Sequence, residues 1–223
     1  MPYYYEILCL ANSNKYSGRC VAGKITEGPR AGHWLRPIGT GEKHEITDRD
    51  RLYQDNSYAQ KLDIIRIKFK ALAAPSFQQE NNVIDDETYW VKTAQATLAD
   101  LENLLDHPRT LWENGNHSYS GVNDRVSTDI LTQPRQTLLL IKPTNVRISV
   151  EAEGAQFGNF KRVVRAHFTY NSIDYALTVK DAEAEAYYLS QPDGEYPISA
   201  NYFTISLGEA YKGEAYKLVA AIF

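Results

Sequence analysis

The chain has 223 residues, of which 43% are hydrophobic, 23% charged and 12% aromatic, and its formal net charge is −4. This length suits one large domain or two small ones, and the composition excludes a disordered or collagen-like chain. The net acidic charge argues against a protein that coats nucleic acid through bulk electrostatics. Basic residues nevertheless outnumber acidic ones in 1–70 and 135–180, and acidic residues dominate the segments between and after them.

Nothing in the sequence predicts a membrane or a secreted protein. No segment approaches the roughly 18 consecutive apolar residues that a membrane span needs. The first ten residues, MPYYYEILCL, lack the basic segment and the cleavage site of a signal peptide. The two cysteines, Cys9 and Cys20, are too few for a disulfide framework in a chain of this length. We therefore expect a cytoplasmic protein that contacts no membrane.

The first half of the chain opens with three strand patterns, at residues 3–10, 19–26 and 33–38, separated by turn-forming residues. A fourth strand is predicted at 62–72, where apolar and basic side chains alternate with period two. A helix is predicted at 93–106, because three leucines recur at helical spacing and a proline follows.

The second half has a more regular pattern. Strands are predicted at 137–151, 160–170, 174–179, 201–207 and 215–222, with an alanine-rich helix at 182–189. This is the order of an OB-fold, a partly open five-stranded barrel that binds oligonucleotides or oligosaccharides. The first half fits the same order less cleanly. We therefore predict a mainly β protein with two OB-like five-stranded barrels and one or two short helices. The first barrel, with an insertion, covers 1–134, and the second covers 135–223.

No motif in the sequence supports catalysis. Residues 18–24 match the first seven positions of the phosphate-binding pattern G-x-x-x-x-G-K-[ST], but Ile25 replaces the hydroxyl residue that binds magnesium. The same stretch also falls on a predicted strand, whereas the motif lies between a strand and a helix. The five histidines are too far apart for a short metal-ligand motif. We expect no enzyme activity, no cofactor and no metal site.

Two blocks of the sequence resemble a known family. The first is LANSNKYSGRCVAGK at 10–24 with GHWLRPI at 32–38, and the second is YFTISLGE at 202–209 with YKLVAAI at 216–222. In these blocks the chain is similar to the prokaryotic dual OB-containing domain family, whose two-barrel members are associated with biological-conflict systems and thought to bind nucleic acid. The resemblance implies a recognition component of a prokaryotic defence system, working beside an effector protein encoded nearby.

The residues around the first predicted turn suit a surface that contacts nucleic acid. Lys15 and Arg19 carry the positive charge that phosphate contacts need, and Asn12 and Ser13 can donate or accept hydrogen bonds. We therefore include these four residues in the predicted interface.

Trp34 and Arg36 add a ring and a charge on one strand face, because side chains two residues apart point the same way. A base stacked on such a ring contributes about 1–3 kcal/mol. The alternative is that Trp34 plugs the end of a barrel and Arg36 pairs with an acid, since large aromatic residues dominate cores.

Basic side chains also share faces of two predicted strands. They are Arg66, Lys68 and Lys70 in the first half, and Lys161, Arg165 and His167 in the second. A polyanion would relieve their mutual repulsion and release counterions. The alternative is a solvated sheet edge or face, which lysines protect from aggregation.

From these residues we predict a non-catalytic protein that binds DNA or RNA, with single strands favoured. Two other functions fit the same features: a sensor of a nucleotide or another small phosphorylated ligand, and an adaptor that recruits an effector protein. Oligonucleotide binding with a steep salt dependence indicates the first function, and saturation by a mononucleotide indicates the second. The adaptor shows neither.

Overall fold

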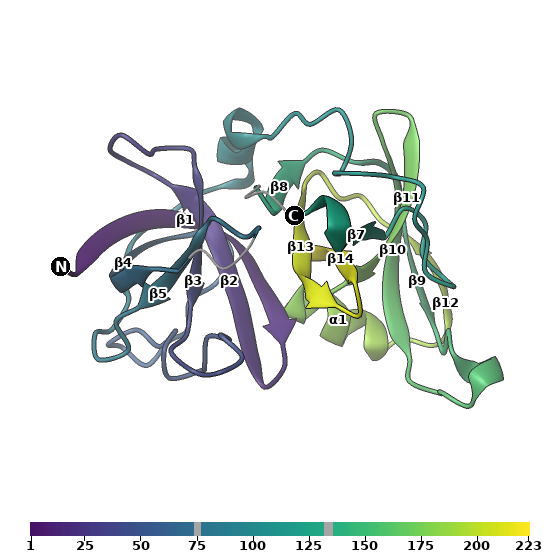
Figure 1. Cartoon of the computed structure of the whole chain (residues 1–223), viewed down its shortest axis with the longest axis horizontal. Coiled ribbons are helices and arrows are strands. Elements are labelled where there is room, and N and C mark those ends of the chain that lie inside the picture. The colour runs from purple at the N-terminus through teal and green to yellow at the C-terminus, as the bar shows by residue number, and fades with distance from the viewer. Residues whose placement is uncertain (74–76, 132–135) are drawn as a thin grey trace. The chain divides into compact units, whose positions relative to one another are not determined.

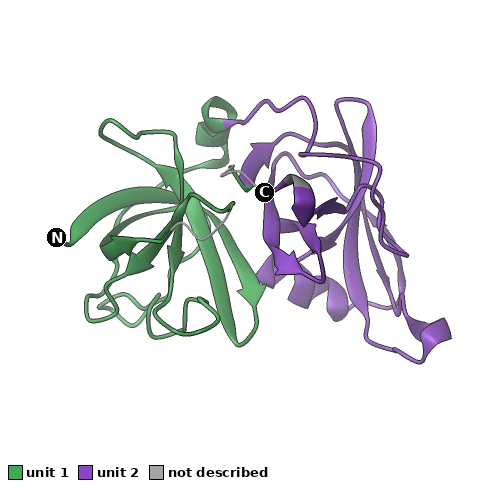
Figure 2. Cartoon of the chain, in the orientation of Figure 1, with its two compact units in different colours: residues 1–104, 133–137 green, residues 105–132, 138–223 purple. Residues whose placement is uncertain are grey.

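The chain forms two compact units (Figures 1 and 2). The computed structural model describes residues 1–73, 77–131 and 136–223. Unit 1 comprises residues 1–104 with the described part of 133–137, and unit 2 comprises the described part of 105–132 with 138–223. The predicted boundary between residues 134 and 135 lies outside the described residues.

Unit 1 is a closed five-stranded barrel with one added strand. Its elements are β1 (Tyr3–Lys15), β2 (Gly18–Ile25), β3 (Trp34–Ile38), β4 (Asp63–Leu72), β5 (Asn81–Ile84), β6 (Val91–Gln95) and the 3-10 helix η1 (Leu98–Leu104). The strands pair in the order β1–β2–β3–β5–β4, and β4 returns to β1 and closes the ring. β3 and β5 run parallel, and the other neighbours in the ring are antiparallel. β6 is the added strand: it pairs with residues 63–66 of β4, whereas β5 pairs with residues 69–72 of the same strand.

The first strand closes this barrel because it is long enough to serve two neighbours. Its residues 3–8 pair with β4, and its residues 7–15 pair with β2. A bulge between Cys9 and Ala11 bends the strand where it passes from one neighbour to the other. Gly23 makes the close approach possible, because a Cβ there would lie 2.1 Å from the carbonyl oxygen of Leu8.

Alternation along β4 sets the two faces of the barrel, as the sequence predicts. Ile65, Ile67 and Phe69 are fully buried in the core of unit 1, and Arg66 and Lys70 are exposed. The apolar face of this strand therefore points inward, and its basic face points outward.

Unit 2 repeats this strand order with an interrupted first strand. Its elements are β7 (Arg125–Ser127), η2 (Thr128–Ile130), β8 (Leu138–Ile141), β9 (Thr144–Glu151), η3 (Ala155–Phe157), β10 (Val163–Tyr170), β11 (Ile173–Val179), α1 (Ala182–Leu189), β12 (Gly194–Pro197), β13 (Phe203–Tyr211) and β14 (Glu214–Ile222). The sheet runs β9–β10–β11–β14–β13–β8, and only Lys142 and Pro143 separate β8 from β9 in the chain. β8 and β9 therefore act together as the first strand, interrupted at a proline that has no N–H to donate.

Residues 122–127 fill a gap in unit 2, where the third and fifth barrel strands diverge. β11 and β14 pair in parallel only around Val179. Further along, Val122 pairs with Ala176 of β11, and β7 pairs with β14. Val126 is fully buried there. A stretch that precedes all five barrel strands in the chain is thus part of the second barrel.

The predicted fold class is confirmed: the protein is mainly β, and its barrels are OB-like. The predicted helix at 182–189 is α1, whose first turn is capped by the Asp181 carboxylate. The helix predicted at 93–106 is wrong in part, because the chain forms the end of β6 and then η1 there. In the described part of the chain, none of the helices has the length and apolar character to cross a membrane.

Candidate nucleic-acid interface

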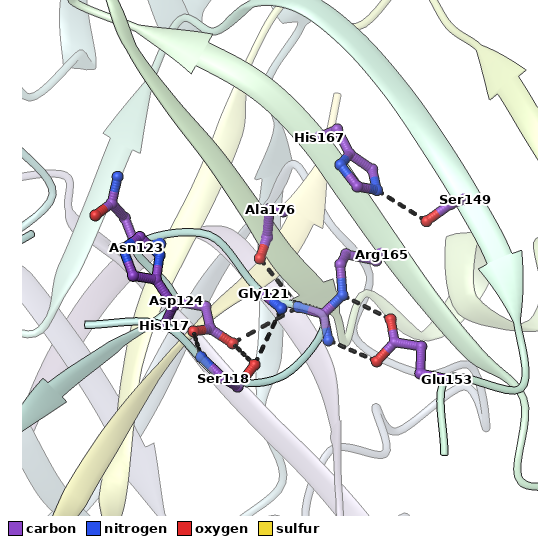
Figure 3. Close-up of polar contacts among 10 residues, drawn as sticks. All are labelled: His117, Ser118, Gly121, Asn123, Asp124, Ser149, Glu153, Arg165, His167 and Ala176. Atoms are coloured by element: carbon purple, nitrogen blue, oxygen red, sulfur yellow. Dashed lines mark hydrogen bonds and ion pairs between the residues drawn. The ribbon is translucent and has the colours of Figure 1, made fainter. Parts of the chain in front are cut away.

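Arg165 lies on β10, on the outer face of the second barrel, yet its side chain is buried in a network of acids (Figure 3). Its Nε and Nη2 donate to the carboxylate of Glu153 at 2.6 and 2.7 Å, and Nη1 lies 3.7 Å from Oδ2 of Asp124. Nη1 also donates to the carbonyl oxygen of Ala176 at 3.0 Å. Because its charge is already balanced and only 5% of the residue is exposed, we remove Arg165 from the predicted interface.

Asp124, the second acid on Arg165, is held by a tight turn (Figure 3). The backbone N–H of Ser118 donates to its carboxylate at 2.7 Å, and the Ser118 hydroxyl donates to the same group. Gly121 closes the turn, because a Cβ at that position would lie 1.9 Å from Oδ2 of Asp124. Arg165 therefore fixes the segment before β7 onto the barrel.

Next to Arg165 on the same face, His167 of β10 lies between Arg147 and Ser149 of β9. Its Nε2 is 2.9 Å from the Ser149 hydroxyl oxygen, and its Nδ1 is 3.5 Å from Nη2 of Arg147. Since a guanidinium can only donate, Nδ1 accepts, so Nε2 carries the proton and donates to Ser149. Burial, and then the charge of Arg147, lower the pKa of His167. The neutral form of this histidine is therefore favoured.

The loop between β9 and β10, residues 152–162, carries exposed rings. Phe157 is 73% and Phe160 is 74% exposed. Tyr119, which is 77% exposed, meets the edge of the Phe157 ring at 5.5 Å between centroids. Lys161 is exposed beside Phe160, so this predicted residue lies among rings that are accessible to a ligand.

In unit 1, the hairpin between β1 and β2 combines a ring with basic residues. Tyr16 at its turn is 68% exposed, and Nζ of Lys43 lies 4.9 Å from its ring centroid. The flanking Lys15 and Arg19 are partly exposed. A bridge between Arg19 and Ile46 places the loop that contains Lys43 beside the hairpin.

Asn12 and Ser13 lie deeper in β1 than the hairpin turn. Nδ2 of Asn12 donates to the carbonyl oxygen of Ala59 at 3.0 Å, and the Ser13 hydroxyl donates to that of Cys20 at 3.4 Å. Both residues are buried, so these hydrogen bonds serve the barrel itself.

Trp34 and Arg36 alternate with Leu35, a core residue, and lie on the outer side of β3. They are nevertheless 5% and 3% exposed. Arg36 lies 3.3 Å from Oε1 of Glu80, and it donates to Asn81 at 3.0 Å. The contacts of Arg36 therefore agree with the alternative, in which this arginine pairs with an acid. A buried ring does not stack on a base, so we remove Trp34 and Arg36 from the interface.

The basic face of β4 is largely neutralised by the acids that follow β5. Nζ of Lys68 lies 2.9 Å from Oδ2 of Asp85, and the hydrogen bond from Lys68 holds the pKa of Asp85 below its usual value. Arg66 remains exposed, with Cζ 4.8 Å from the ring centroid of Tyr4. The predicted residues of unit 1 are therefore spread over separate parts of its barrel: the hairpin, β3 and β4.

One of the two cysteines, Cys9, is buried in the core of unit 1. Burial raises the pKa of the Cys9 thiol to about 12, which leaves it unreactive. Within residues 1–73, 77–131 and 136–223, no three side chains of His, Cys, Asp or Glu gather to hold a metal ion.

The family model of the dual OB-containing domain matches residues 5–222, nearly the whole chain. The chain belongs to this family. The description of the family as a dual OB-containing domain agrees with the two barrels found here, one in each compact unit. A comparison with curated proteins finds no match. Membership in the dual OB-containing domain family indicates a module that binds nucleic acid or protein.

Sequence reasoning missed four of the exposed rings, Tyr16, Tyr119, Phe157 and Phe160. The available signal was an aromatic residue inside a polar, turn-forming stretch, such as KYSG at 15–18 and QFGNF at 156–160. Such a ring has few neighbours along the chain to bury it, so exposure is the expected state.

Proposed function

We propose that the chain is a non-catalytic nucleic-acid-binding module that holds single strands through the connection between the first two strands of each barrel. In unit 1 this connection is the β1–β2 hairpin, and in unit 2 it is the β9–β10 loop. The observation that carries the proposal is that both connections present exposed rings beside basic side chains.

Rings and cations in these positions match the chemistry of an unpaired strand. Each base has two flat faces that stack on an aromatic side chain, which contributes about 1–3 kcal/mol per base whatever the sequence. In a duplex those faces are already stacked on neighbouring bases, so a ring platform favours single strands. In OB-folds, the loop between strands one and two is among the parts that bind oligonucleotides.

Local charge supports the same ligand in a chain that is acidic overall. Lys15 and Arg19 flank Tyr16 along the hairpin, Lys43 lies over its ring, and Lys161 follows Phe160. Each phosphate that these groups neutralise releases counterions and makes the slope of log K against log salt steeper by about 0.7 for single strands. A few such contacts give a measurable but moderate salt dependence.

The test is fluorescence anisotropy with labelled single-stranded and duplex oligonucleotides at two salt concentrations. Wild type is compared with Tyr16→Ala, with Phe157→Ala and with Phe160→Ala. Tyr89→Ala is the matched control, because Tyr89 is 52% exposed but lies outside both connections. We expect each of the three variants to weaken single-strand binding about tenfold and the control to leave it unchanged. Absence of binding at low salt, or equal binding by all variants, contradicts the proposal.

The family resemblance supports a finer proposal, that the module recognises foreign nucleic acid for a prokaryotic defence system. Here the measurement is plaque formation on bacteria that carry the complete system with the wild-type chain or with Phe157→Ala. Protection that survives loss of strand binding would assign the chain an adaptor role instead.

A further inference from the structure

The outer face of β9, β10 and β11 contains a small hollow that the proposed strand-binding loops do not include. It measures about 290 Å³, and its polar lining comes from Asn145, Arg147, His167, Thr169 and Asp174. Ligand sites usually measure about 300–1,000 Å³, so this volume suits a small molecule rather than an oligomer.

Two irregularities of the sheet produce the hollow. The pairing of β10 with β9 shifts register between His167 and Thr169, which bends the strand locally. Asn145 adopts a left-handed backbone with φ of 54° at the start of β9. Val122, which pairs with Ala176, forms a wall on the side of β11.

One row of side chains in the hollow places the positive charge of Arg147 beside the ring of His167. Arg147 and His167 are direct cross-strand partners, with Nη2 and Nδ1 3.5 Å apart. Arg147 also lies 3.2 Å from Glu195, but the side chains of this ion pair are 48% and 63% exposed. Exposed pairs contribute little, so Arg147 can exchange Glu195 for a ligand anion.

A second row of side chains offers hydrogen-bond acceptors and donors. It lies two residues further along the strands than Arg147 and His167, which is about 7 Å away. There the Thr169 hydroxyl donates to Oδ1 of Asp174 at 2.9 Å, and Nδ2 of Asn145 donates to the Thr169 hydroxyl oxygen at 3.4 Å. Asp174 is exposed, so it can accept further hydrogen bonds from a ligand.

We propose that this hollow binds a single nucleotide, with its phosphate at Arg147, next to His167, and a sugar hydroxyl or base amino group at Asp174. A ligand with an anion at one end and donors about 7 Å away satisfies both rows, whereas a simple dianion meets repulsion from Asp174. The site goes beyond the proposed function, because it uses neither the exposed rings nor the lysines of the loops.

The ligand source is either a free nucleotide or the phosphorylated end of a strand. Isothermal titration calorimetry with nucleoside 5′-monophosphates, the corresponding nucleosides and inorganic phosphate tests the first. A 5′-phosphorylated trinucleotide against its unphosphorylated form tests the second. We expect saturable 1:1 binding of a phosphorylated ligand and at least tenfold weaker binding of the nucleoside or of phosphate alone.

Variants locate the site. Arg147→Ala should weaken binding of the phosphorylated ligand about tenfold or more, because it removes a charge-assisted hydrogen bond. Arg125→Ala is the matched control: it removes another partly exposed arginine of unit 2, one that is ion-paired with Glu214 away from the hollow. Circular dichroism and the thermal midpoint establish that each variant is folded. Phe157→Ala should leave nucleotide binding intact, which separates this site from the proposed strand interface.

Protonation of His167 provides a second readout. This ring faces Arg147 and Arg165, which disfavour its charged form, and Glu195 and Glu153, which favour it. A bound phosphate raises the pKa of His167, so wild type should gain affinity, relative to His167→Gln, as the pH falls from 7.5 to 5.5. The proposal is overturned if no nucleotide or phosphorylated trinucleotide binds at millimolar concentration, if Arg147→Ala and Arg125→Ala bind alike, or if His167→Gln has the wild-type pH profile.

Discussion

The two barrels share a strand order but close the space between their third and fifth strands differently. In unit 1, β3 and β5 pair directly over Arg36–Ile38. In unit 2, β11 and β14 pair over two residues, and the segment around β7 fills the remaining gap. The second barrel therefore depends on a stretch from outside its five strands, whereas the first closes with its own.

The same comparison separates structural cations from those available to a ligand. Arg36 and Arg165 both lie on outer barrel faces, and both are buried against acids from other elements. Lys161 and the hairpin residues Lys15 and Arg19 retain solvent contact. Arg36 and Arg165 thus tie elements together, whereas the basic residues at the two connections carry charge that a polyanion can reach.

The largest expected effect concerns Arg165. Arg165→Ala leaves the carboxylates of Glu153 and Asp124 buried without their cation, which should lower the free energy of unfolding by about 3–5 kcal/mol. Urea denaturation followed by circular dichroism measures the loss. A decrease below about 1 kcal/mol would show that β7 does not depend on this arginine.

The next effect compares how much each barrel contributes to the binding of a single strand. The β9–β10 loop offers two rings, and the β1–β2 hairpin offers one. The combined change Phe157→Ala with Phe160→Ala should therefore weaken single-strand binding about a hundredfold, against about tenfold for Tyr16→Ala. Anisotropy titrations measure both. Equal losses would mean that the barrels contribute alike.

A smaller effect is expected in the pH dependence of the free energy of unfolding. Lys217 of β14 is 1% exposed and donates to Oδ1 of Asn114 at 3.2 Å, and burial lowers its pKa to about 7. Between this value and the ordinary pKa of about 10.4, the unfolded chain binds more protons than the folded one. The free energy of unfolding should thus rise with pH above 7, by at most about 1.4 kcal/mol per pH unit.

Lys217→Met provides the control for this pH dependence. Urea unfolding of both proteins between pH 7 and 9 isolates the contribution of Lys217, because other titrating groups affect both equally. Parallel curves would contradict a neutral Lys217 in the folded protein.

The smallest effect distinguishes a loop lysine from a strand lysine. Lys161→Ala should reduce the salt slope of single-strand binding by about 0.7, the value for one lost phosphate contact. Lys68→Ala should leave the slope unchanged, since Lys68 is paired with Asp85. Titrations at four salt concentrations measure both slopes, and an equal reduction in the two variants would restore β4 to the interface.

Much of the fold is predictable because each barrel strand has a local pattern. Ile65, Ile67 and Phe69 alternate with basic residues, and Asp181 signals the start of α1. Two elements of the first barrel have no such local pattern. β5 has no apolar run, since its first residues are asparagines, and leucines three residues apart fit the 3-10 helix η1 as well as an α-helix.

The candidate site is less predictable, because burial of a charge depends on partners that are distant in sequence. Arg36 pairs with Glu80, and Arg165 pairs with Asp124, contacts that only the folded chain brings together. A single sequence identifies the arginines but not their acids.

The segment that fills the second barrel has a consequence for synthesis on the ribosome. Val122 leaves the ribosome well before its partner Ala176, and Val126 must wait for Ala215. At about 5–20 residues per second, the delay for Val126 is roughly 4–18 s. During translation the apolar side chains of this stretch have no complete barrel to join until the last strand emerges.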